Sequence, residues 1–385
     1  MAIAWPGNVE ATGRRIRGDP DRARRQHGRS HGPASPWKHA VTAERLNRRG
    51  PVHVQRAESE GLNVSEIKVF GLGCSRTQAQ AIAAALGVPP AGIEEREFED
   101  GEHKARPLES VYGADVYVVH SLYADREQSG NDKLCRLLFF LATVRDQGAA
   151  RVTAIVPYLC YARKDRRTKP HDPITTRYVA QMFEASGVDR VLVLDVHNPA
   201  AFENAFRCRT ELLHAQELFV EHLLAGMRTQ DVTVLSPDAG GLKRADAFRE
   251  VMQKAHDRPV GLGLMEKRRS AGVVSGDTLF ADVAGRSVII VDDMIGTGTT
   301  LLRAARASRD AGARAVLAVA SHGLFVGSAA TALADPVLDR IVVTDSVSPF
   351  RLEGSPAAAR VQILASAPLF ARAIRQWRGE ESATA

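Results

Sequence analysis

The stretch "VIIVDDMIGTGTTLL" occupies residues Val288–Leu302. Four apolar residues lead into two adjacent carboxylates, Asp292 and Asp293, and a loop of glycine and threonine follows at once. The apolar run predicts a buried strand, the loop predicts a turn, and "LLRAARASRDAG" (301–312) predicts a helix. A strand, a tight turn and a helix in this order form the repeating unit of a parallel sheet covered by helices.

The same alternation of strands and helices continues on both sides of this stretch, from Ile67 onward. Short apolar runs such as "VYVVHS" (116–121) alternate with helical patterns such as "NDKLCRLLFFLATVRDQG" (131–148). The alternation occurs in two series of similar length and style. The sequence therefore predicts an α/β fold with two domains, 65–212 and 213–382, each a mainly parallel sheet flanked by helices.

Residues 1–64 differ from the rest of the chain in composition. They are rich in Arg, Gly, Pro and His, have few apolar residues and lack periodicity, which predicts a disordered basic extension. Residues 1–60 hold 12 Lys/Arg and 6 Asp/Glu, and this excess accounts for the whole net charge of +6. The remaining chain is neutral, so its charge gives no reason to expect a nucleic-acid partner. RNA or an acidic surface as a partner of the extension is the alternative that composition leaves open.

Composition also limits the class and location of the protein. The 385 residues are 44% hydrophobic and 25% charged, which is typical of a globular protein large enough for two domains. No apolar run is long enough for a membrane span, and the first residues lack the pattern of a secretory signal. The four cysteines are far apart and form no zinc spacing: Cys74, Cys135, Cys160 and Cys208. We expect a cytoplasmic protein with no membrane partner, and buried free thiols.

The chemistry of the loop after Asp293 is that of an anion site. Backbone N–H groups of the loop and of the following helix start form an anion cradle, and threonine hydroxyls add donors. The loop is not a Walker P-loop, because Thr299 stands where that motif requires lysine. The two carboxylates repel an anion but accept hydrogen bonds from hydroxyls. A ligand with a phosphate at one end and vicinal hydroxyls at the other suits both parts, as ribose 5-phosphate does; a carboxylate pair that only caps a helix is the structural alternative.

The hypothesis assigns six residues to this sugar phosphate, with hydroxyls on the two carboxylates and the phosphate on the loop: Asp292, Asp293, Thr297, Gly298, Thr299 and Thr300. Four further segments also lie at strand ends: "FEDGE" (98–102), "YARKDRR" (161–167), "DVH" (195–197) with "SPDAGG" (236–241), and "EKRRS" (266–270). An aromatic face with acceptors suits adenine, and a cationic loop suits a triphosphate. A solvated acidic turn and a solvated basic face are the alternatives.

The five segments together, in this order, resemble those of the ribose-phosphate diphosphokinase (phosphoribosyl pyrophosphate synthetase) family. The stretch at Val288–Leu302 resembles the ribose-phosphate-binding signature of phosphoribosyltransferases. The resemblance extends over roughly residues 66–380 and implies two tandem phosphoribosyltransferase-like domains. It also implies transfer of the β,γ-diphosphoryl group of ATP to ribose 5-phosphate, with Mg²⁺ as cofactor. A homodimer or higher homo-oligomer with shared active sites is implied as well.

The resemblance implies roles for individual residues. ATP is expected on the acidic turn and the cationic loop: Phe98, Asp100, Glu102, Arg163 and Asp165. His197 and Asp238 correspond to the family's magnesium–nucleotide site, although a lone histidine is more often structural and an aspartate before "AGG" can be a helix N-cap. Lys267 and Arg269, two residues apart, correspond to the catalytic pair on a mobile loop, where they would neutralise charge on the transferring group.

The sequence also departs from the family pattern. The loop "DDMIGTGTT" (292–300) is one residue shorter than in many bacterial members, and "NPAAFENAF" (198–206) replaces a turn that contains glutamine. Phosphate activation, ADP inhibition and strictness for ATP are therefore left open. Two alternatives stand beside the diphosphokinase. A phosphoribosyltransferase that consumes the diphosphate would leave the first half unexplained, and a non-catalytic regulator should have lost Lys267, Arg269 or the acidic pair.

Overall fold

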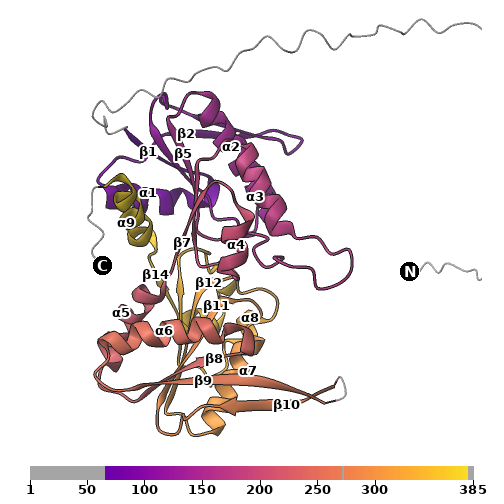
Figure 1. The fold of residues 1–385 in the computed structure, drawn as a ribbon, viewed down its shortest axis with the longest axis vertical. Helices are drawn as coiled ribbons and strands as arrows, with labels where there is room; N and C mark the ends of the chain where they lie inside the picture. Colours follow the sequence, from indigo (N-terminus) through magenta and orange to yellow (C-terminus); the bar gives the residue numbers. More distant parts are fainter. Residues whose placement is uncertain (1–65, 271–272, 380–385) are drawn as a thin grey trace, which may run out of the picture. The chain divides into compact units, whose positions relative to one another are not determined.

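The computed structural model describes residues 66–270 and 273–379, and the side chains of 267–277 are outside that description. The disordered extension predicted for 1–64 lies outside the described residues. The rest of the predicted fold class is confirmed, because the described chain consists of mainly parallel sheets flanked by helices (Figure 1). The described residues belong to one compact unit.

The N-terminal half is built on a five-stranded parallel sheet in the order β1-β4-β5-β6-β7. Its strands are β1 (Ile67–Gly71), β4 (Asp115–Val119), β5 (Arg151–Val156), β6 (Arg190–Leu194) and β7 (Arg209–Leu213). Its helices are α1 (Arg76–Leu86), α2 (Gly130–Asp146), α3 (Thr175–Ala185) and α4 (Pro199–Ala205), with the short 3₁₀ turn η1 (Gly73–Ser75) before α1. Because both faces of the sheet are covered, β4 is buried at every position.

The C-terminal half has a seven-stranded sheet in the order β10-β9-β8-β11-β12-β13-β14, with only the β9–β10 pair antiparallel. Its strands are β8 (Val232–Ser236), β9 (Val260–Ser270), β10 (Val273–Phe280), β11 (Ser287–Ile295), β12 (Ala315–Gly323), β13 (Arg340–Thr344) and β14 (Val361–Leu364). Its helices are α5 (Gln216–Met227), α6 (Leu242–Ala255), α7 (Thr299–Asp310), α8 (Ala329–Ala332) and α9 (Ala367–Arg378), with 3₁₀ turns η2 (Ala239–Gly241), η3 (Phe350–Leu352) and η4 (Pro356–Arg360).

One hydrophobic cluster runs through both halves. It joins Ile82 of α1 to Phe219 of α5, Phe248 of α6 and Phe370 of α9. The last helix, α9, packs against α1 of the first half rather than only on its own sheet (Figure 1). The predicted domain boundary between residues 212 and 213 falls at the end of β7 and stays a prediction.

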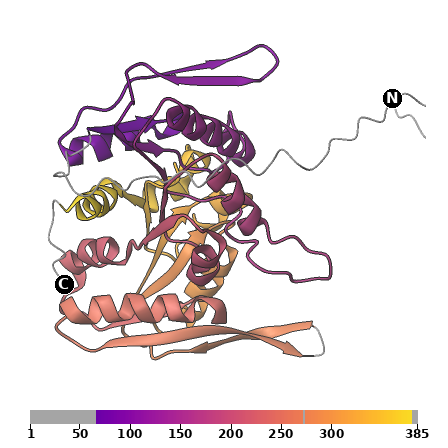
Figure 2. The same cartoon turned by 45° about the horizontal axis from the view of Figure 1, so that its top comes forward.

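Two strand pairs were not expected from the sequence. β2 (Ile93–Glu97) and β3 (His103–Pro107) form an antiparallel hairpin, visible as a projecting ribbon in Figure 2, and "FEDGE" is its turn. The expectation of a loop around Lys267 and Arg269 was wrong for the backbone, because β9 continues to Ser270 and pairs with β10. The sequence shows no apolar pattern for this strand pair, because the pairing of β9 with β10 satisfies backbone hydrogen-bonding groups and needs no apolar side chains.

Two further expectations concern solvent. No helix of the described chain is long and apolar enough to cross a membrane. The four thiols are free, but the expectation that they are buried was wrong for two of them, since Cys74 and Cys135 are exposed and Cys208 is partly buried. Burial raises the pKa of Cys160 to about 12. The two exposed thiols lie on η1 and on a polar position of α2.

Candidate active site

The carboxyl ends of β6 and β11 bring the two halves of the predicted site into contact. His197 follows β6 and Asp293 lies in β11, and His197 Nδ1 is 3.0 Å from Asp293 Oδ2. The contact with Asp293 raises the pKa of His197, against the effect of burial. A residue expected to serve the nucleotide thus touches a residue expected to serve the sugar. Sequence reasoning named both but gave no reason for them to be neighbours.

A guanidinium holds the two adjacent carboxylates together. Arg244, in the first turn of α6, donates from Nη1 to Asp292 Oδ1 at 3.1 Å, and its Nη2 is 3.3 Å from Asp293 Oδ1. Gly241 makes room for this arrangement, because a Cβ there would lie 2.8 Å from Ser236 Oγ and 3.5 Å from Arg244 Nη1. Sequence reasoning did not name Arg244 as a site residue. The available signal was its position, three residues after the glycines of "SPDAGG".

The side chains of Asp292 and Asp293 differ in their exposure to solvent and in their hydrogen-bond partners. The side chain of Asp293 is 5% exposed, and both of its oxygens are engaged, one by Arg244 and one by His197. The side chain of Asp292 is 25% exposed, and its Oδ1 accepts from Arg244 and from the Asp293 N–H at 2.9 Å. Burial, and then the neighbouring Asp293, raise the pKa of Asp292 to about 7. Asp292 is therefore the more accessible of the two carboxylates, whereas Asp293 joins the two halves.

The predicted phosphate loop lies between β11 and α7. Gly298 is the N-cap of α7 with φ of 78°, and a Cβ there would lie 2.8 Å from Leu333 Cδ2. Both facts require glycine at this position. Thr297 and Thr299 are exposed, and their hydroxyl oxygens are 2.9 Å apart. Thr300 follows within the first turn of α7, where backbone N–H groups lack helical partners, so the segment has the features of an anion cradle.

Two of the basic side chains in the cationic loop after β5 contact Asp172 in the same loop. Lys164 Nζ is 2.6 Å from Asp172 Oδ2, and Arg167 Nε donates to the Asp172 carbonyl at 3.1 Å. Arg163 is exposed. Asp165 Oδ2 accepts from Asn198 Nδ2 at 2.6 Å, and Asn198 is the residue after His197. The loop is thus tied to the His197 segment through Asn198, a residue that sequence reasoning did not single out.

Asp195, at the start of the "DVH" turn, joins strands of both halves. Its φ is 31°, an uncommon backbone conformation for a residue other than glycine. Its carboxylate accepts from His214 Nδ1 at 2.8 Å and from the hydroxyl of Ser321, while His322 Nε2 is 2.8 Å from its carbonyl oxygen. Strained backbone held by several partners is a common feature of functional sites. Here it fixes the direction in which His197 leaves β6.

The two residues expected to hold a metal are His197 and Asp238. Asp238 Oδ1 accepts from the Gly241 N–H at 3.1 Å, which is the N-cap role that the sequence offered as the alternative, and the residue is exposed. The His197 side chain is 47% exposed, and only its Nδ1 is engaged by Asp293. Among the described residues, no group of three His, Cys, Asp or Glu forms a closed metal site. This absence does not conflict with the expected Mg²⁺, which keeps several waters and takes one or two protein ligands together with substrate phosphates.

Over the described residues, the "FEDGE" turn (98–102) is not brought into contact with this centre. Phe98 is 39% exposed, with the Arg96 guanidinium 5.0 Å from its ring centre. Asp100 Oδ1 accepts only from the Glu102 N–H, at 3.1 Å, within the same turn. Over the described residues, no hydrogen bond or ion pair links this turn to the centre. Lys267 and Arg269 lie in β9, and only their backbone is described.

Known proteins resemble the chain along most of its length. Residues 67–187 match the N-terminal domain of ribose phosphate pyrophosphokinase, and residues 267–385 match the phosphoribosyl synthetase-associated domain. The ribose-phosphate pyrophosphokinase of Pasteurella multocida is 36% identical over 322 residues, which are 83% of this chain and 98% of that protein. That of Parasynechococcus marenigrum is 35% identical over 333 residues, 86% of this chain and 96% of its own.

The fold leads to the same class. The crystal structure of phosphoribosylpyrophosphate synthetase from Mycobacterium smegmatis superposes with a TM-score of 0.73 at 28% sequence identity, covering 82% of this chain and 100% of that one. Two α/β halves, each a mainly parallel sheet flanked by helices, define the phosphoribosyltransferase-like fold class that the sequence predicted. Within that class, the chain belongs to the ribose-phosphate pyrophosphokinase family. This membership confirms the family that the five segments indicated.

Proposed function

We propose that the protein transfers the β,γ-diphosphoryl group of ATP to the C1 hydroxyl of ribose 5-phosphate, giving 5-phosphoribosyl 1-diphosphate and AMP. The observation that carries the proposal is the 3.0 Å contact between His197 and Asp293, which joins the nucleotide side of the site to the sugar side. Family membership supports the same reaction. A phosphoribosyltransferase that consumes the diphosphate would give the N-terminal half and its match at residues 67–187 no role.

The sugar is held by the second half in this proposal. The 5-phosphate lies on the loop of Thr297–Thr300, and the exposed oxygen of Asp292 accepts from a ribose hydroxyl. Asp293 mainly holds the side chains of Asp292 and His197 in position. The C1 oxygen then attacks the β-phosphorus in line, the bond from that phosphorus to the α–β bridging oxygen breaks, and AMP leaves with that oxygen. The proton of the C1 hydroxyl passes to solvent.

The nucleotide is held by the first half. Arg163 faces the phosphates, and Asp165, fixed by Asn198, faces the nucleoside. Lys267 and Arg269 on β9 are assigned to the charge that develops on the transferring group, where a cationic donor matters most. His197 and Asp238 would hold Mg²⁺, which when bound neutralises phosphate charge and orients the diphosphate. Positioning and charge neutralisation supply the catalysis, and no general base is assigned.

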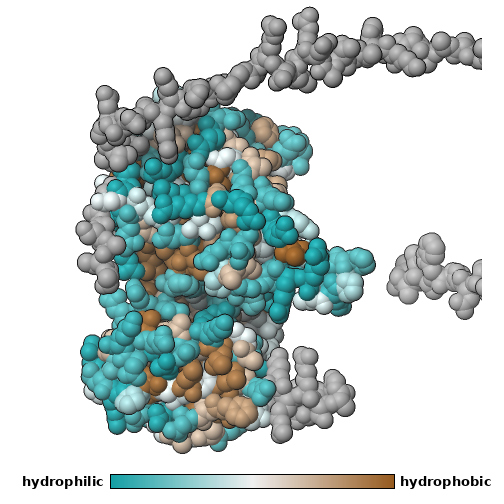
Figure 3. Space-filling model, in the orientation of Figure 1, coloured by the Kyte–Doolittle hydropathy of each residue, from teal (hydrophilic) through white to brown (hydrophobic). Residues whose placement is uncertain are grey.

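The site is proposed to be shared between subunits of a homodimer or larger homo-oligomer. The Phe98–Glu102 turn has the residues for adenine but makes no contact with the centre of its own chain over the described residues, so a neighbouring chain is the proposed recipient. Apolar patches are visible on the face drawn in Figure 3. Large apolar side chains that are exposed in the described chain include Leu108 (56%), Tyr112 (83%), Phe139 (64%), Leu262 (38%) and Phe280 (55%). Exposed groups of this kind favour association. A cytoplasmic location is proposed from the four free thiols.

One assay tests the reaction. The protein is incubated with ATP, Mg²⁺ and ribose 5-phosphate, and AMP and the C1-diphosphate sugar are followed by phosphorus NMR. We expect both products in equal amounts, and none when ribose 5-phosphate is omitted. Formation of ADP and a ribose bisphosphate, or of no product with ATP while the diphosphate sugar is consumed with a base, would contradict the proposal.

A further inference from the structure

Lys133, near the start of α2, has no access to solvent. Its side chain is 0% exposed, its Nζ is 2.6 Å from Asp125 Oδ2, and it lies 3.9 Å from the centre of the Tyr123 ring. Buried ammonium groups are rare and require a paired charge. Asp125 supplies that charge and in turn accepts from the Gln128 N–H at 2.8 Å. The proposed reaction uses none of these groups.

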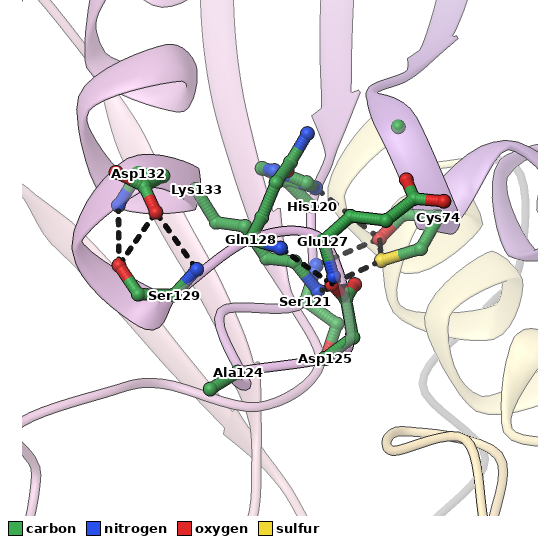
Figure 4. Close-up of polar contacts among 12 residues, drawn as sticks. Cys74, His120, Ser121, Ala124, Asp125, Glu127, Gln128, Ser129, Asp132 and Lys133 are labelled. Atoms are coloured by element: carbon green, nitrogen blue, oxygen red, sulfur yellow. Dashed lines mark hydrogen bonds and ion pairs between the residues drawn. The ribbon is translucent and has the colours of Figure 1, made fainter. Parts of the chain in front are cut away.

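The remaining contact of the ammonium is a thiol. Lys133 Nζ donates to Cys74 Sγ at 3.1 Å, and Figure 4 shows Cys74, Asp125 and Lys133 close together. Cys74 itself is exposed, on the short turn η1. It also lines a cavity of about 160 Å³ together with Ser121 and Tyr123, so a small solute reaches the sulfur. A thiol that faces a cation and is open to solvent has the environment of reactive cysteines.

A second buried group without a partner lies beside the pair. His120 is 1% exposed, and its Nε2 has no hydrogen-bond partner among the described residues, while its Nδ1 is 3.3 Å from Ser75 Oγ. Burial, and then the charge of Lys133, lower the pKa of His120 to about 3. The ring is therefore neutral and adds no positive charge. Among the described residues, Asp125 is the anion in contact with Lys133, so a proton released by Lys133 has an acceptor at 2.6 Å.

We propose that Cys74 and Lys133 form a covalent sulfur–nitrogen link when a hydroperoxide oxidises the thiol. In the first step the sulfur attacks one peroxide oxygen, the O–O bond breaks, and Cys74 becomes a sulfenic acid while the peroxide is reduced to water or an alcohol. In the second step Lys133 gives a proton to Asp125, its nitrogen attacks the sulfur, and the S–O bond breaks with loss of water. The product is a sulfenamide, and a thiol reductant reverses it by attack on the sulfur.

The geometry favours the second step over further oxidation. The nitrogen is already at 3.1 Å from the sulfur, so the condensation is intramolecular and competes well with a second peroxide molecule. Transfer of the proton to Asp125 removes two buried charges together, which lowers the cost of forming the neutral amine. The link would fix η1 to α2 beside the cavity, where Ser121 donates to the Ser346 carbonyl of the second half. The other thiols lack this arrangement in the described structure.

The test uses the full chain and hydrogen peroxide. Intact mass spectrometry is expected to show a loss of two hydrogen masses, and a tryptic digest is expected to contain one peptide that joins Cys74 to Lys133, with trypsin cleavage after Lys133 blocked. A thiol reductant should restore the original mass and the cleavage. Cys74→Ser should abolish the linked peptide. Cys135→Ser is the matched control, because Cys135 is also exposed and lies on α2 without a lysine contact, and it should leave the link unchanged.

The decisive measurement is on the unsubstituted chain, so it does not depend on whether a Lys133 variant folds. Conversion of Cys74 to sulfinic or sulfonic acid with Lys133 still cleaved by trypsin would overturn the proposal. So would a linked fraction that is equal in Cys74→Ser. Lys133→Arg adds a further arm: with its basicity kept but no amine, Cys74 should accumulate as overoxidised thiol, and linkage to another lysine would contradict the assignment.

Discussion

Asp292 and Asp293 are neighbours in sequence, but their side chains have different surroundings. Asp293 is buried with both oxygens engaged by Arg244 and His197, while Asp292 is partly exposed and contacts Arg244 through Oδ1. Sequence reasoning treated the pair as two equal acceptors for ribose. The packing against α6 and the turn after β6 makes one carboxylate accessible and buries the other.

The first prediction compares replacement of each aspartate by asparagine. Asp292→Asn should weaken ribose 5-phosphate binding by about 1–2 kcal/mol, roughly tenfold, because the amide accepts without charge assistance. Asp293→Asn should instead lower the free energy of unfolding by about 3 kcal/mol, the low end for a broken buried pair because His197 is half exposed. Calorimetric titration and thermal melts measure the two effects. Loss of ATP affinity with unchanged sugar affinity in Asp292→Asn would mean that the site is assigned backwards.

The second prediction concerns acid stability and His120. The unfolded chain protonates this histidine near its ordinary pKa of 6.5, but the folded chain does so only near 3. Below pH 6.5 the unfolded state therefore binds more protons, and the free energy of unfolding falls by about 1.4 kcal/mol per pH unit for this group. His120→Asn should flatten the acid side of a plot of unfolding free energy against pH. The exposed His171→Asn is the control, and an equal flattening there would refute the account.

At the scale of elements, the start of α7 depends on one glycine. Gly298 combines a φ of 78° with the close approach of Leu333, so two separate costs fall on any side chain. Gly354 has a similar φ of 73° but nothing within 4 Å of the position of a Cβ. Substitutions at the two positions therefore distinguish the free-energy cost of backbone strain from that of steric overlap.

The third prediction uses this pair. Gly354→Ala should cost about 1–2 kcal/mol from backbone conformation. Gly298→Ala should cost that amount plus about 1–3 kcal/mol from overlap with Leu333, and should also weaken ribose 5-phosphate binding because the cradle moves. Chemical denaturation and sugar titration measure both. Equal losses of unfolding free energy in the two variants would show that Leu333 moves aside without an energetic cost.

The β2–β3 hairpin carries the fourth prediction, which rests on a site shared between chains. One variant combines Phe98→Ala with Glu102→Ala, and the other is Lys267→Ala; each alone should be nearly inactive. Refolded together, mixed oligomers should recover a substantial fraction of the activity, because some sites then pair an intact turn with an intact β9. Hetero-oligomers demonstrated by mass with no recovery would mean that each chain builds a complete site from its own residues.

At the scale of the whole molecule, the two halves share a core. The cluster that joins Ile82, Phe219, Phe248 and Phe370 covers one face of both sheets, and α9 lies on α1. Asp195 adds polar contacts to Ser321 and His322 across the same boundary. Neither half buries its apolar surface without the other.

The fifth prediction follows from that shared core. Residues 66–379 should unfold in one cooperative transition, and residues 213–385 expressed alone should show no cooperative melt, because α9 loses α1 and the helices α5 and α6 lose part of their cover. Calorimetry of the full chain and of the fragment provides the measurement. Two resolved transitions in the full chain, or a folded fragment, would favour independent domains.

The sequence by itself determined the class of fold and the family, and it supplied most of the candidate site residues, which stay predictions. Apolar runs that alternate with amphipathic ones predict which segments are buried. The loop of Thr297–Thr300 predicts an anion site, because the backbone geometry at a helix start depends only on neighbouring residues. The same is true of the "FEDGE" turn and the basic loop, whose residue types are visible one at a time. Local chemistry of this kind depends on near neighbours in the chain, which a sequence displays directly.

Only the tertiary structure decided which of these groups meet. Arg244 and Asn198 are ordinary helix-start residues in the sequence, and they acquire roles because α6 and α4 point them at Asp292 and Asp165. The β9–β10 pairing could not be read either, since backbone hydrogen bonds carry it. Lys133 looks like a surface residue of an amphipathic helix until Asp125, Tyr123 and Cys74 enclose it. Contacts between residues far apart in the chain depend on how whole elements pack, and no local pattern encodes that distance.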